Sequence, residues 1–330
     1  SARLWRDGAL VKPNHSFTVE QGAAGERLDK FLVQSSPELG RRGARWLTEN
    51  GRVTVNGIPA LKSYRLSVGE RVDVWQEYGS APEPEPELSL SIVLEREDLV
   101  IVDKPAGQPT APLGDLERGS LAAALLARYP EMRGVGYRPR EPGLLHRLDT
   151  RTSGLVVAAR NEVAFAALRA ALESHSLAKR YLAIVRVERE LPRAGLIERS
   201  LGPDSSGSGR VRVLAPDAPG ARPCSSRFAT LDRRGAFALL EVVAPRAYRH
   251  QVRVHLASSG WPIAGDLEYG GMPEPLLPER HALHASQVAW AGDARVPAFA
   301  VESALPEDLR AFFDAAPAIA GADPSASKTS

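Results

Sequence analysis

Apolar residues in the N-terminal quarter of the chain recur first at helical spacing and then on alternate positions. Leu28, Phe31 and Leu32, in the run GERLDKFLVQSS, lie three and four residues apart and predict an amphipathic helix. The run GRRGARWLTENG predicts a second short helix that ends near Asn50 and Gly51. RVTVNG predicts a strand that enters an Asn-Gly turn, and VGERVDVW alternates as a further strand. The pattern therefore predicts a small α/β module.

The rest of the chain mixes longer runs of both kinds. Segments rich in β-branched and aromatic residues predict strands: SIVLEREDLVIVDKP (two strands around an acidic turn), GLVVAAR, KRYLAIVRVERE and AFALLEVVAP. Helices are predicted for LAAALLARYP, NEVAFAALRAALESHS and LPEDLRAFFDAA, and a surface loop for PDSSGSG. Because strands and helices do not alternate strictly, we expect an α+β domain with a mixed, mainly antiparallel sheet flanked by helices and loops.

A change in composition predicts where the two modules separate. Residues 79–88, GSAPEPEPEL, alternate proline with glutamate, and fixed φ angles with repelling charges favour an extended, stiff linker. We therefore predict a small domain over 16–78 after an N-terminal extension over 1–15, and a larger domain over 89–314. The small and polar residues of 315–330 predict a flexible tail.

Composition narrows the class of protein. The chain has 330 residues, enough for two domains, and its single cysteine, Cys224, excludes both an intramolecular disulfide and a thiolate zinc cluster. A lone thiol fits a reducing compartment. The sequence has no signal-peptide pattern, and apolar runs such as LAAALLA are too short to span a bilayer. We expect a cytoplasmic protein without membrane contact, and a monomer.

Charge is distributed unevenly even though the net charge is only +2. The segment from 27 to 65 holds three acids against eight cations, which are Arg27, Lys30, Arg41, Arg42, Arg45, Arg52, Lys62 and Arg65. A small basic module favours nucleic-acid phosphate as its partner, although a solvated helix face gives the same pattern.

The order of elements in this module resembles the alpha-L RNA-binding module, named after a ribosomal small-subunit protein. The resemblance covers about residues 16–76 and is most specific in the run Gly51–Gly57, GRVTVNG, with basic residues on the helix before it. It implies that this helix docks on an RNA backbone through Arg41, Arg42 and Arg45.

The run LLHRLDTRTSG, residues 144–154, carries the most unusual chemistry of the larger domain, a lone carboxylate between cations. Asp149 before Thr and Ser is typical of a turn. Its apolar surroundings would desolvate it in part, and cations from this run and from RAYRHQVRVHL (246–256) would keep it ionised and oriented. Such a carboxylate is suited to act as a nucleophile or a general base.

Other chemistries lack part of their pattern. A retaining glycosidase needs a second carboxylate, and Glu162 is predicted to begin a helix. The histidine pairs at 250 and 255 and at 281 and 284 lack a third metal ligand, so no metal is expected. Phosphate-binding glycine loops and the Gly-x-Ser-x-Gly pattern of serine hydrolases are missing from the sequence.

The run His146–Gly154, HRLDTRTSG, resembles the signature of the ribosomal large-subunit type of pseudouridine synthase. Further segments agree with that family in order along the chain, over roughly residues 88–312. They are DKPAG (103–107), KRYLA (179–183), HQVRVHL (250–256), PIAGD (262–266), Tyr269–Gly270 and LHA (283–285). The resemblance implies the pseudouridine synthase fold and an RNA-directed isomerase without cofactor or metal.

Roles follow from the resemblance residue by residue. Asp149 matches the catalytic aspartate, Arg253 the arginine that pairs with it, and Tyr181 the tyrosine that stacks on the base and helps in proton transfer. Arg147 matches the residue that fills the space left by the flipped nucleotide. Substrate contacts are expected from Lys104 and from His250.

One stretch departs from the family. Ahead of His250 the family carries Thr-Gly-Arg-Thr or close to it, whereas this chain has Arg246, Ala247, Tyr248 and Arg249. Ala247 does not adopt positive φ as cheaply as glycine. We expect the change to retune which RNA is accepted.

Three functions remain open from the sequence. The first is an RNA pseudouridine synthase, with large-subunit ribosomal RNA favoured over transfer RNA because the added module suits a large structured substrate. The second is a non-catalytic RNA-binding or ribosome-assembly protein that retains the fold. The third is a hydrolase that uses Asp149 on a nucleoside.

Overall fold

The helices and strands of the chain fall into two units. The computed structural model describes residues 5–6, 9–10, 13–36, 39–75, 81–112, 117–204, 210–245 and 248–317, and for residues 1–10 and 42 no side chain. By contacts, one unit comprises residues 1–88 with 111–142, and the other comprises 89–110 with 143–330. The linker over 79–88 between domains at 16–78 and 89–314 remains a prediction from the sequence.

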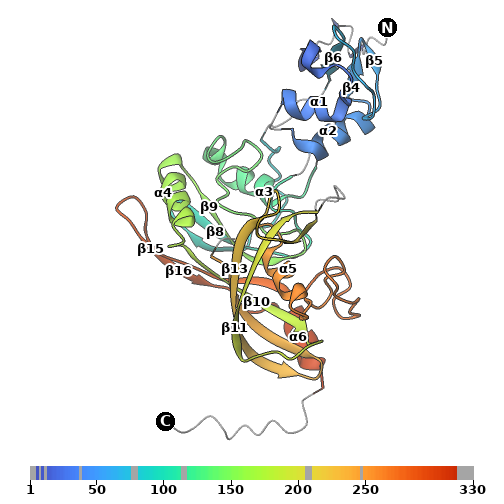
Figure 1. Cartoon of the computed structure of the whole chain (residues 1–330). Helices are drawn as coiled ribbons and strands as arrows, with labels where there is room; N and C mark the ends of the chain where they lie inside the picture. The colour runs from blue at the N-terminus through green and yellow to red at the C-terminus, as the bar shows by residue number, and fades with distance from the viewer. Residues whose placement is uncertain are drawn as a thin grey trace, which may run out of the picture. The chain divides into compact units, whose positions relative to one another are not determined.

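The first unit contains a four-stranded antiparallel sheet in the order β3-β6-β4-β5, with two helices packed on each other (Figure 1). Its elements are β1 (Trp5–Arg6), β2 (Ala9–Leu10), β3 (His15–Thr18), η1 (Gln21–Ala23), α1 (Leu28–Ser35), α2 (Gly40–Glu49), β4 (Val53–Val55), β5 (Ile58–Pro59), β6 (Arg71–Val74), α3 (Leu121–Arg128) and η2 (Pro130–Met132). The two predicted helices and the predicted strands of the small module are confirmed.

The core of this small domain consists of the positions whose spacing predicted it. Leu28, Phe31 and Leu32 of α1 are buried together with Leu47 of α2 and with valines of β4 and β6. Burial of each such side chain contributes about 1.5–3 kcal/mol, so the amphipathic pattern itself decides which face of α1 turns inward.

Two turns of the domain depend on positive φ. Gly51 has φ +65° directly after the last turn of α2, as expected for a helix C-terminus. Asn56 and Gly57 have φ of 49° and 80° and join β4 to β5, which is the type I′ pattern of a two-residue hairpin. The predicted helix end and turn are therefore confirmed.

The glutamate-proline segment ends in a buried contact. Glu85 is 5% exposed, and both of its carboxylate oxygens accept the backbone N–H of Gly119, at 3.0 and 3.2 Å. Its own N–H donates to the carbonyl of Ala123 in α3 at 3.2 Å. This part of the predicted linker thus packs within the first unit.

The second unit is built on one ten-stranded sheet, in the order β12-β11-β13-β14-β10-β15-β9-β8-β7 with β16 also paired to β15. Its elements are β7 (Ile92–Glu95), β8 (Leu99–Lys104), β9 (Ser153–Ala159), α4 (Glu162–Glu173), β10 (Ala178–Arg186), β11 (Ala194–Pro203), β12 (Val211–Leu214), β13 (Arg222–Arg234), β14 (Phe237–Val243), α5 (Gln251–Ser258), β15 (Leu283–Gly292), β16 (Pro297–Glu302) and α6 (Glu307–Ala315).

The sheet is mixed and mainly antiparallel, as predicted. Among the described strands the pair β15–β9 alone is parallel, and it is only two residues long, Ser153 opposite His284 and Gly154 opposite Ala285. Gly154 has φ +117°, and a Cβ atom there would lie 2.3 Å from the carbonyl oxygen of Ala285. A glycine is therefore required where the two halves of the sheet meet, immediately after the loop of Asp149.

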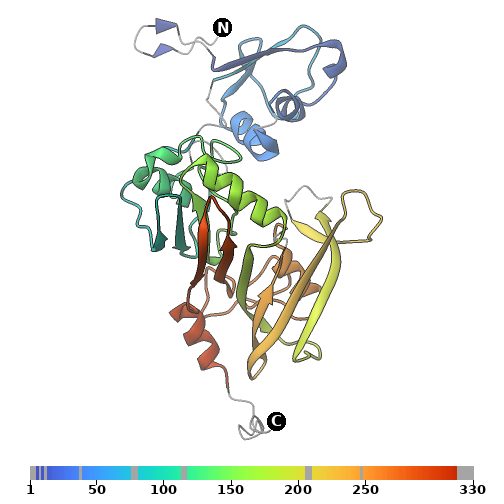
Figure 2. The same ribbon diagram turned by 90° about the vertical axis from the view of Figure 1, so that its left-hand side faces the viewer.

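Helices pack on both halves of this sheet. α4 contacts β9, and α5 contacts β11, β12 and β13. Figure 2 shows the green helix α4 running obliquely over the sheet, and Figure 1 shows α5 beside the long strand β13. The predicted helices α4 and α6 are confirmed, and the unit is α+β. Among the residues that the structure describes, no helix is long and apolar enough to cross a membrane.

Candidate active site

Asp149 lies in a tight turn that leads into β9. The backbone N–H of Thr152 donates to the carbonyl of Asp149 at 3.0 Å, and Leu145 just before the loop pairs with Val157 of β9 at 3.1 Å. The main chain thus supplies the turn, which leaves the carboxylate of Asp149 for other contacts. Its side chain is 27% exposed, so it is partly desolvated, as the sequence predicts.

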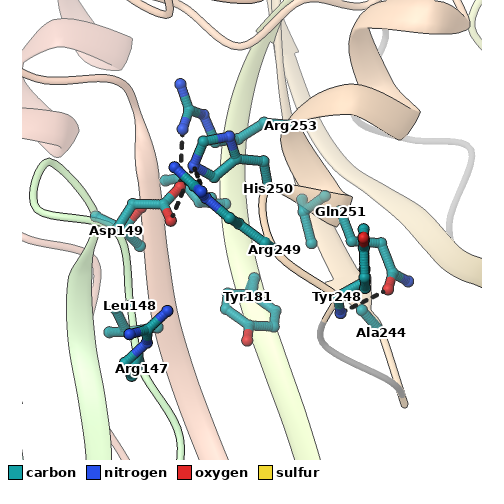
Figure 3. Close-up of a pocket in the computed structure, with 13 residues that line it drawn as sticks. Arg147, Leu148, Asp149, Tyr181, Ala244, Tyr248, Arg249, His250, Gln251 and Arg253 are labelled. Carbon is teal, nitrogen blue, oxygen red and sulfur yellow. Dashed lines mark hydrogen bonds and ion pairs between the residues drawn. The ribbon is translucent and has the colours of Figure 1, made fainter. Parts of the chain in front are cut away.

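Arg253 of α5 holds that carboxylate. Its Nη1 donates to Asp149 Oδ2 at 2.8 Å, while Nε and Nη2 both donate to Asp266 at 2.7 Å. Nη2 also donates to Glu268 at 2.9 Å. The Arg253 side chain is 6% exposed and that of Asp266 is 2% exposed, so the guanidinium fork is fixed from behind and presents Nη1 to Asp149 (Figure 3).

The charge of Arg253 is secured by its surroundings. Burial opposes the charged guanidinium, but the hydrogen bonds and negative charges of Asp266 and Asp149 outweigh burial, and the pKa of Arg253 is raised. The guanidinium also lies over the ring of Tyr269, 4.8 Å from its centre. A carboxylate at the position of Asp149 therefore always faces a cation.

His250 approaches the other oxygen of the aspartate. It stands before the first turn of α5 with φ 57°, and its Nε2 lies 3.5 Å from Asp149 Oδ1. Its Nδ1 is 2.6 Å from the hydroxyl of Tyr269. Burial lowers the pKa of His250, although the charge of Asp149 raises it in part, and the net lowering favours the neutral imidazole.

Gln251 fixes the entry to α5. It is 2% exposed, donates to the carbonyl of Ser225 at 2.8 Å and accepts the backbone N–H of Tyr248 at 3.0 Å. Tyr248 itself lies under the guanidinium of Arg222, 5.3 Å from the ring centre. Of the stretch that departs from the family pattern, Arg246 and Ala247 lie outside the described residues.

Tyr181 comes from β10, at a bulge between Arg180 and Tyr181 in the pairing with β15. The side chain is 6% exposed. Burial, and then the charge of Asp149, raises the pKa of Tyr181 to about 12, so its hydroxyl keeps its proton. Among the described residues we find no hydrogen-bond partner for this hydroxyl, which lines the pocket (Figure 3).

These side chains enclose one pocket. Its empty volume, counted together with the space open to solvent, is about 470 Å³. Arg147 is exposed at its edge. The lining consists of Arg147, Leu148, Asp149, Thr152, Tyr181, Ala244, Tyr248, Arg249, His250, Gln251, Val252, Arg253 and Leu283. Five of the predicted site residues thus come together in space.

Lys104 contacts the backbone of the loop that carries Asp149. Its ammonium is fully buried and donates to the carbonyls of Pro105 and Gln108 at 2.8 Å and of Thr150 at 3.3 Å. Burial lowers the pKa of Lys104 to about 7, although the charge of Asp149 raises it in part. Substrate contact by Lys104 stays a prediction, and this geometry favours a role in holding the loop.

Two histidines anchor the residues after the turn. His281 Nε2 lies 2.7 Å from Thr152 Oγ1, and His284 Nδ1 lies 2.9 Å from Ser153 Oγ. Burial, and then the positive charge of Arg253, lowers the pKa of His281 to about 3. In the described ranges no group of three or more His, Cys, Asp or Glu side chains is arranged to hold a metal ion.

No role was predicted from the sequence for Asp266, Glu268 or Tyr269, although PIAGD and Tyr-Gly are among the resembling segments. A signal for Asp266 was present in the sequence. An arginine placed between two buried valines needs an acid as its partner, and Asp266 closes the apolar run of PIAGD.

The predicted RNA-contacting arginines lie on α2 of the first unit. Arg41 and Arg45 are exposed, one helical turn apart, and Arg45 Nε donates to Glu49 at 2.8 Å. The side chain of Arg42 lies outside the described residues.

The sequence of this chain matches known protein families and named relatives. Residues 98–258 match the family model of RNA pseudouridylate synthases, and residues 26–72 match that of the S4 domain. A protein of Chloroflexus aurantiacus called an uncharacterized RNA pseudouridine synthase is 35% identical over 79% of this chain and 80% of its own length. The ribosomal large subunit pseudouridine synthase D of Nitrosomonas europaea is 31% identical over 91% of this chain and 87% of its own.

Solved structures support the fold. The human RNA pseudouridylate synthase domain containing 4 aligns with 68% of this chain and 92% of its own at a TM-score of 0.54 and 20% identity. The family models, together with relatives that are 31% and 35% identical over most of this chain, show that the chain belongs to the RNA pseudouridylate synthases, carries an N-terminal S4 domain and is an RNA pseudouridine synthase, an isomerase that binds RNA.

Proposed function

We propose that this chain converts uridine to pseudouridine in large-subunit ribosomal RNA, with Asp149 as the nucleophile and without a cofactor. One observation supports this most strongly. The carboxylate of Asp149 is partly exposed in a pocket, is held by Arg253 at 2.8 Å, and shares that pocket with the ring of Tyr181.

The reaction balances without a co-reactant. The bond from the sugar C1′ to N1 of uracil breaks, the base turns within the pocket, and a bond from C1′ to C5 forms. The proton of C5 leaves to solvent and N1 gains a proton, so there is no net oxidation. Asp149 assists either by adding to the base or by attacking C1′, and both routes need an ionised, fixed carboxylate.

Tyr181 and Arg147 take complementary roles in the proposal. The ring of Tyr181 stacks on the uracil, and its protonated hydroxyl, kept so by a pKa of about 12, takes part in proton transfer. Chemistry on a base requires its extrusion from the stack, which costs a few kcal/mol. Arg147, exposed at the pocket edge two residues before Asp149, fills the space that the nucleotide leaves.

The choice of RNA rests on the S4 domain and on relatives. Arg41 and Arg45 present cations on one face of α2, which suits contact with phosphates of a folded RNA. The relative from Nitrosomonas europaea is named for the large ribosomal subunit, which favours ribosomal over transfer RNA here. We propose that the enzyme acts in the cytoplasm as a monomer.

The proposal is tested by incubating the purified chain with transcripts of large-subunit ribosomal RNA and of transfer RNAs, followed by mapping of pseudouridine. We expect pseudouridine at defined uridines of the ribosomal transcript. Modification of transfer RNA alone would overturn the substrate class. Free uracil with an abasic product would identify a hydrolase, and RNA bound but unchanged would identify a non-catalytic binding protein.

A further inference from the structure

Tyr269 contacts His250 on the side of the imidazole away from Asp149. The hydroxyl of Tyr269 lies 2.6 Å from Nδ1 of His250, while Nε2 of the same ring faces Asp149 Oδ1 at 3.5 Å. The hydrogen bond at Nδ1 therefore bears on whether Nε2, the nitrogen that faces Asp149, carries the imidazole proton.

The position of the hydroxyl proton follows from a backbone contact. The N–H of Val211, at the start of β12, donates to the Tyr269 hydroxyl at 3.0 Å, so this oxygen is already an acceptor. Burial raises the pKa of Tyr269, which keeps the hydroxyl protonated. Its proton can then be donated to Nδ1 of a neutral His250, which places the imidazole proton on Nε2.

The Nδ1–H tautomer is disfavoured by the contact between Nε2 and Asp149. With the proton on Nδ1, a lone pair on Nε2 would face the lone pairs of Asp149 Oδ1. Arg249 Nε is the competing partner of Nε2 and donates to it at 3.4 Å, close to the 3.5 Å from Nε2 to Asp149 Oδ1, but Arg249 is an exposed side chain, whereas Asp149 is held in place by Arg253. The other charges that act on His250 are Arg253 and Glu268, one of each sign.

We propose that Tyr269 is a positioning residue of this enzyme, whose hydroxyl fixes the proton of His250 on Nε2 so that the imidazole donates to Asp149. The carboxylate is then held at both oxygens, by Arg253 on Oδ2 and by His250 on Oδ1. The chain of contacts runs from the backbone of β12 through Tyr269 and His250 to the nucleophile. The effect on catalysis rests on the proposed function, whereas the position of the proton does not.

The variant Tyr269→Phe isolates the hydroxyl. Phenylalanine keeps the ring that packs edge-on against His250, at 5.6 Å between centres, and that lies under Arg253 at 4.8 Å. Only the two hydrogen bonds of the hydroxyl are removed. Tyr137→Phe, on an exposed tyrosine outside the pocket, is the matched control.

The proton is located by ¹⁵N NMR of histidine-labelled protein, with the His250 signals assigned from a His250→Gln sample. We expect the Nε2–H form in the wild type and a mixture of tautomers, or the Nδ1–H form, in Tyr269→Phe. A wild-type His250 protonated on Nδ1 would overturn the proposal even if the enzyme makes no pseudouridine.

Kinetics give the second measurement. Single-turnover formation of pseudouridine should slow about 5- to 30-fold in Tyr269→Phe, the loss expected for one or two hydrogen bonds that orient the nucleophile, with unchanged RNA affinity. Tyr137→Phe should keep the wild-type rate and tautomer. If Tyr269→Phe also retains both, the hydroxyl does not position the site.

Discussion

Replacing Asp266 by asparagine tests whether the buried acid behind Arg253 organises the pocket. Asp266 is 2% exposed and accepts Nε and Nη2 of Arg253, each at 2.7 Å. Asparagine has the same shape, but its amide nitrogen would point N–H groups at the guanidinium. Only one of the two bonds can be kept, and the buried charge of Arg253 loses its nearest counter-charge.

The size of the effect follows from burial of both partners. Removing one member of a buried ion pair costs about 3–5 kcal/mol, and one retained hydrogen bond places Asp266→Asn near the lower end. For a domain of this size each kcal/mol corresponds to about 2–4 °C, so the unfolding temperature of the second unit should fall by about 6–12 °C. The loosened guanidinium should also slow pseudouridine formation by about 5- to 30-fold, or 1–2 kcal/mol in the barrier.

The unfolding temperature is measured by scanning calorimetry. The rate of pseudouridine formation is measured in single-turnover kinetics at 25 °C, where the variant remains folded. Asp314→Asn is the matched control, because it removes the same charge from an exposed pair with Arg234 at 3.0 Å. Exposed pairs contribute about 0–1 kcal/mol, so this control should change little. On the scale of about 2–4 °C per kcal/mol, a difference of less than about 2 °C between Asp266→Asn and Asp314→Asn would mean that the buried acid contributes less than about 1 kcal/mol. The buried cluster would then not hold the site.

Three further predictions concern the backbone, acid stability and RNA contact. Gly154→Ala should destabilise the second unit by more than about 3 kcal/mol in urea unfolding, because its Cβ would lie 2.3 Å from a β15 carbonyl oxygen. Gly270→Ala, also at positive φ (84° against 117°) but with no atom within 4 Å of its Cβ, should cost only about 1–2 kcal/mol. Equal losses would refute the steric explanation. For His281 the folded-state pKa of about 3 is below that of the unfolded chain, so below pH 6.5 the unfolded state alone gains a proton and stability falls by about 1.4 kcal/mol per pH unit until about pH 3. Urea midpoints of His281→Gln measured from pH 7 to 4 should therefore fall less steeply than those of the wild type, and parallel curves would contradict the shift. Arg45→Gln should weaken RNA binding and lower the salt slope by about 1 in filter binding, while Arg169→Gln, on a helix of the second unit and likewise paired with a glutamate one turn later at 2.8 Å, should not.

Local pattern was sufficient to predict several elements. The helix around Leu28 and Leu32 and the Asn56-Gly57 turn follow from spacing and from residues that favour positive φ, both of which act within a few residues. By contrast β13 was not predicted, since its sequence RPCSSRFATLDRR is mostly polar and only Ser226 and Phe228 in it are buried. Its long pairings with β11 and β14, not its own composition, make it a strand.

The site shows the same division between local and long-range information. Asp149, Arg253 and Tyr181 were predicted from resembling segments, and the structure brings all three to one pocket although 104 residues separate the first two. The roles of Asp266 and Tyr269 were not predicted, because each depends on a contact with a side chain from another segment of the fold, Arg253 and His250 respectively. A sequence shows that an arginine is present, but only the fold shows which acid stands behind it.

The central claim is that the Asp149 carboxylate carries the chemistry of this enzyme, and the variant Asp149→Asn tests it most directly. The asparagine keeps the shape of a side chain that is 27% exposed, so the fold and RNA affinity should match the wild type. Release of tritium from RNA labelled at C5 of uridine measures the reaction. We predict that this release is abolished in Asp149→Asn; release at the wild-type rate would contradict the assignment of Asp149 as the nucleophile.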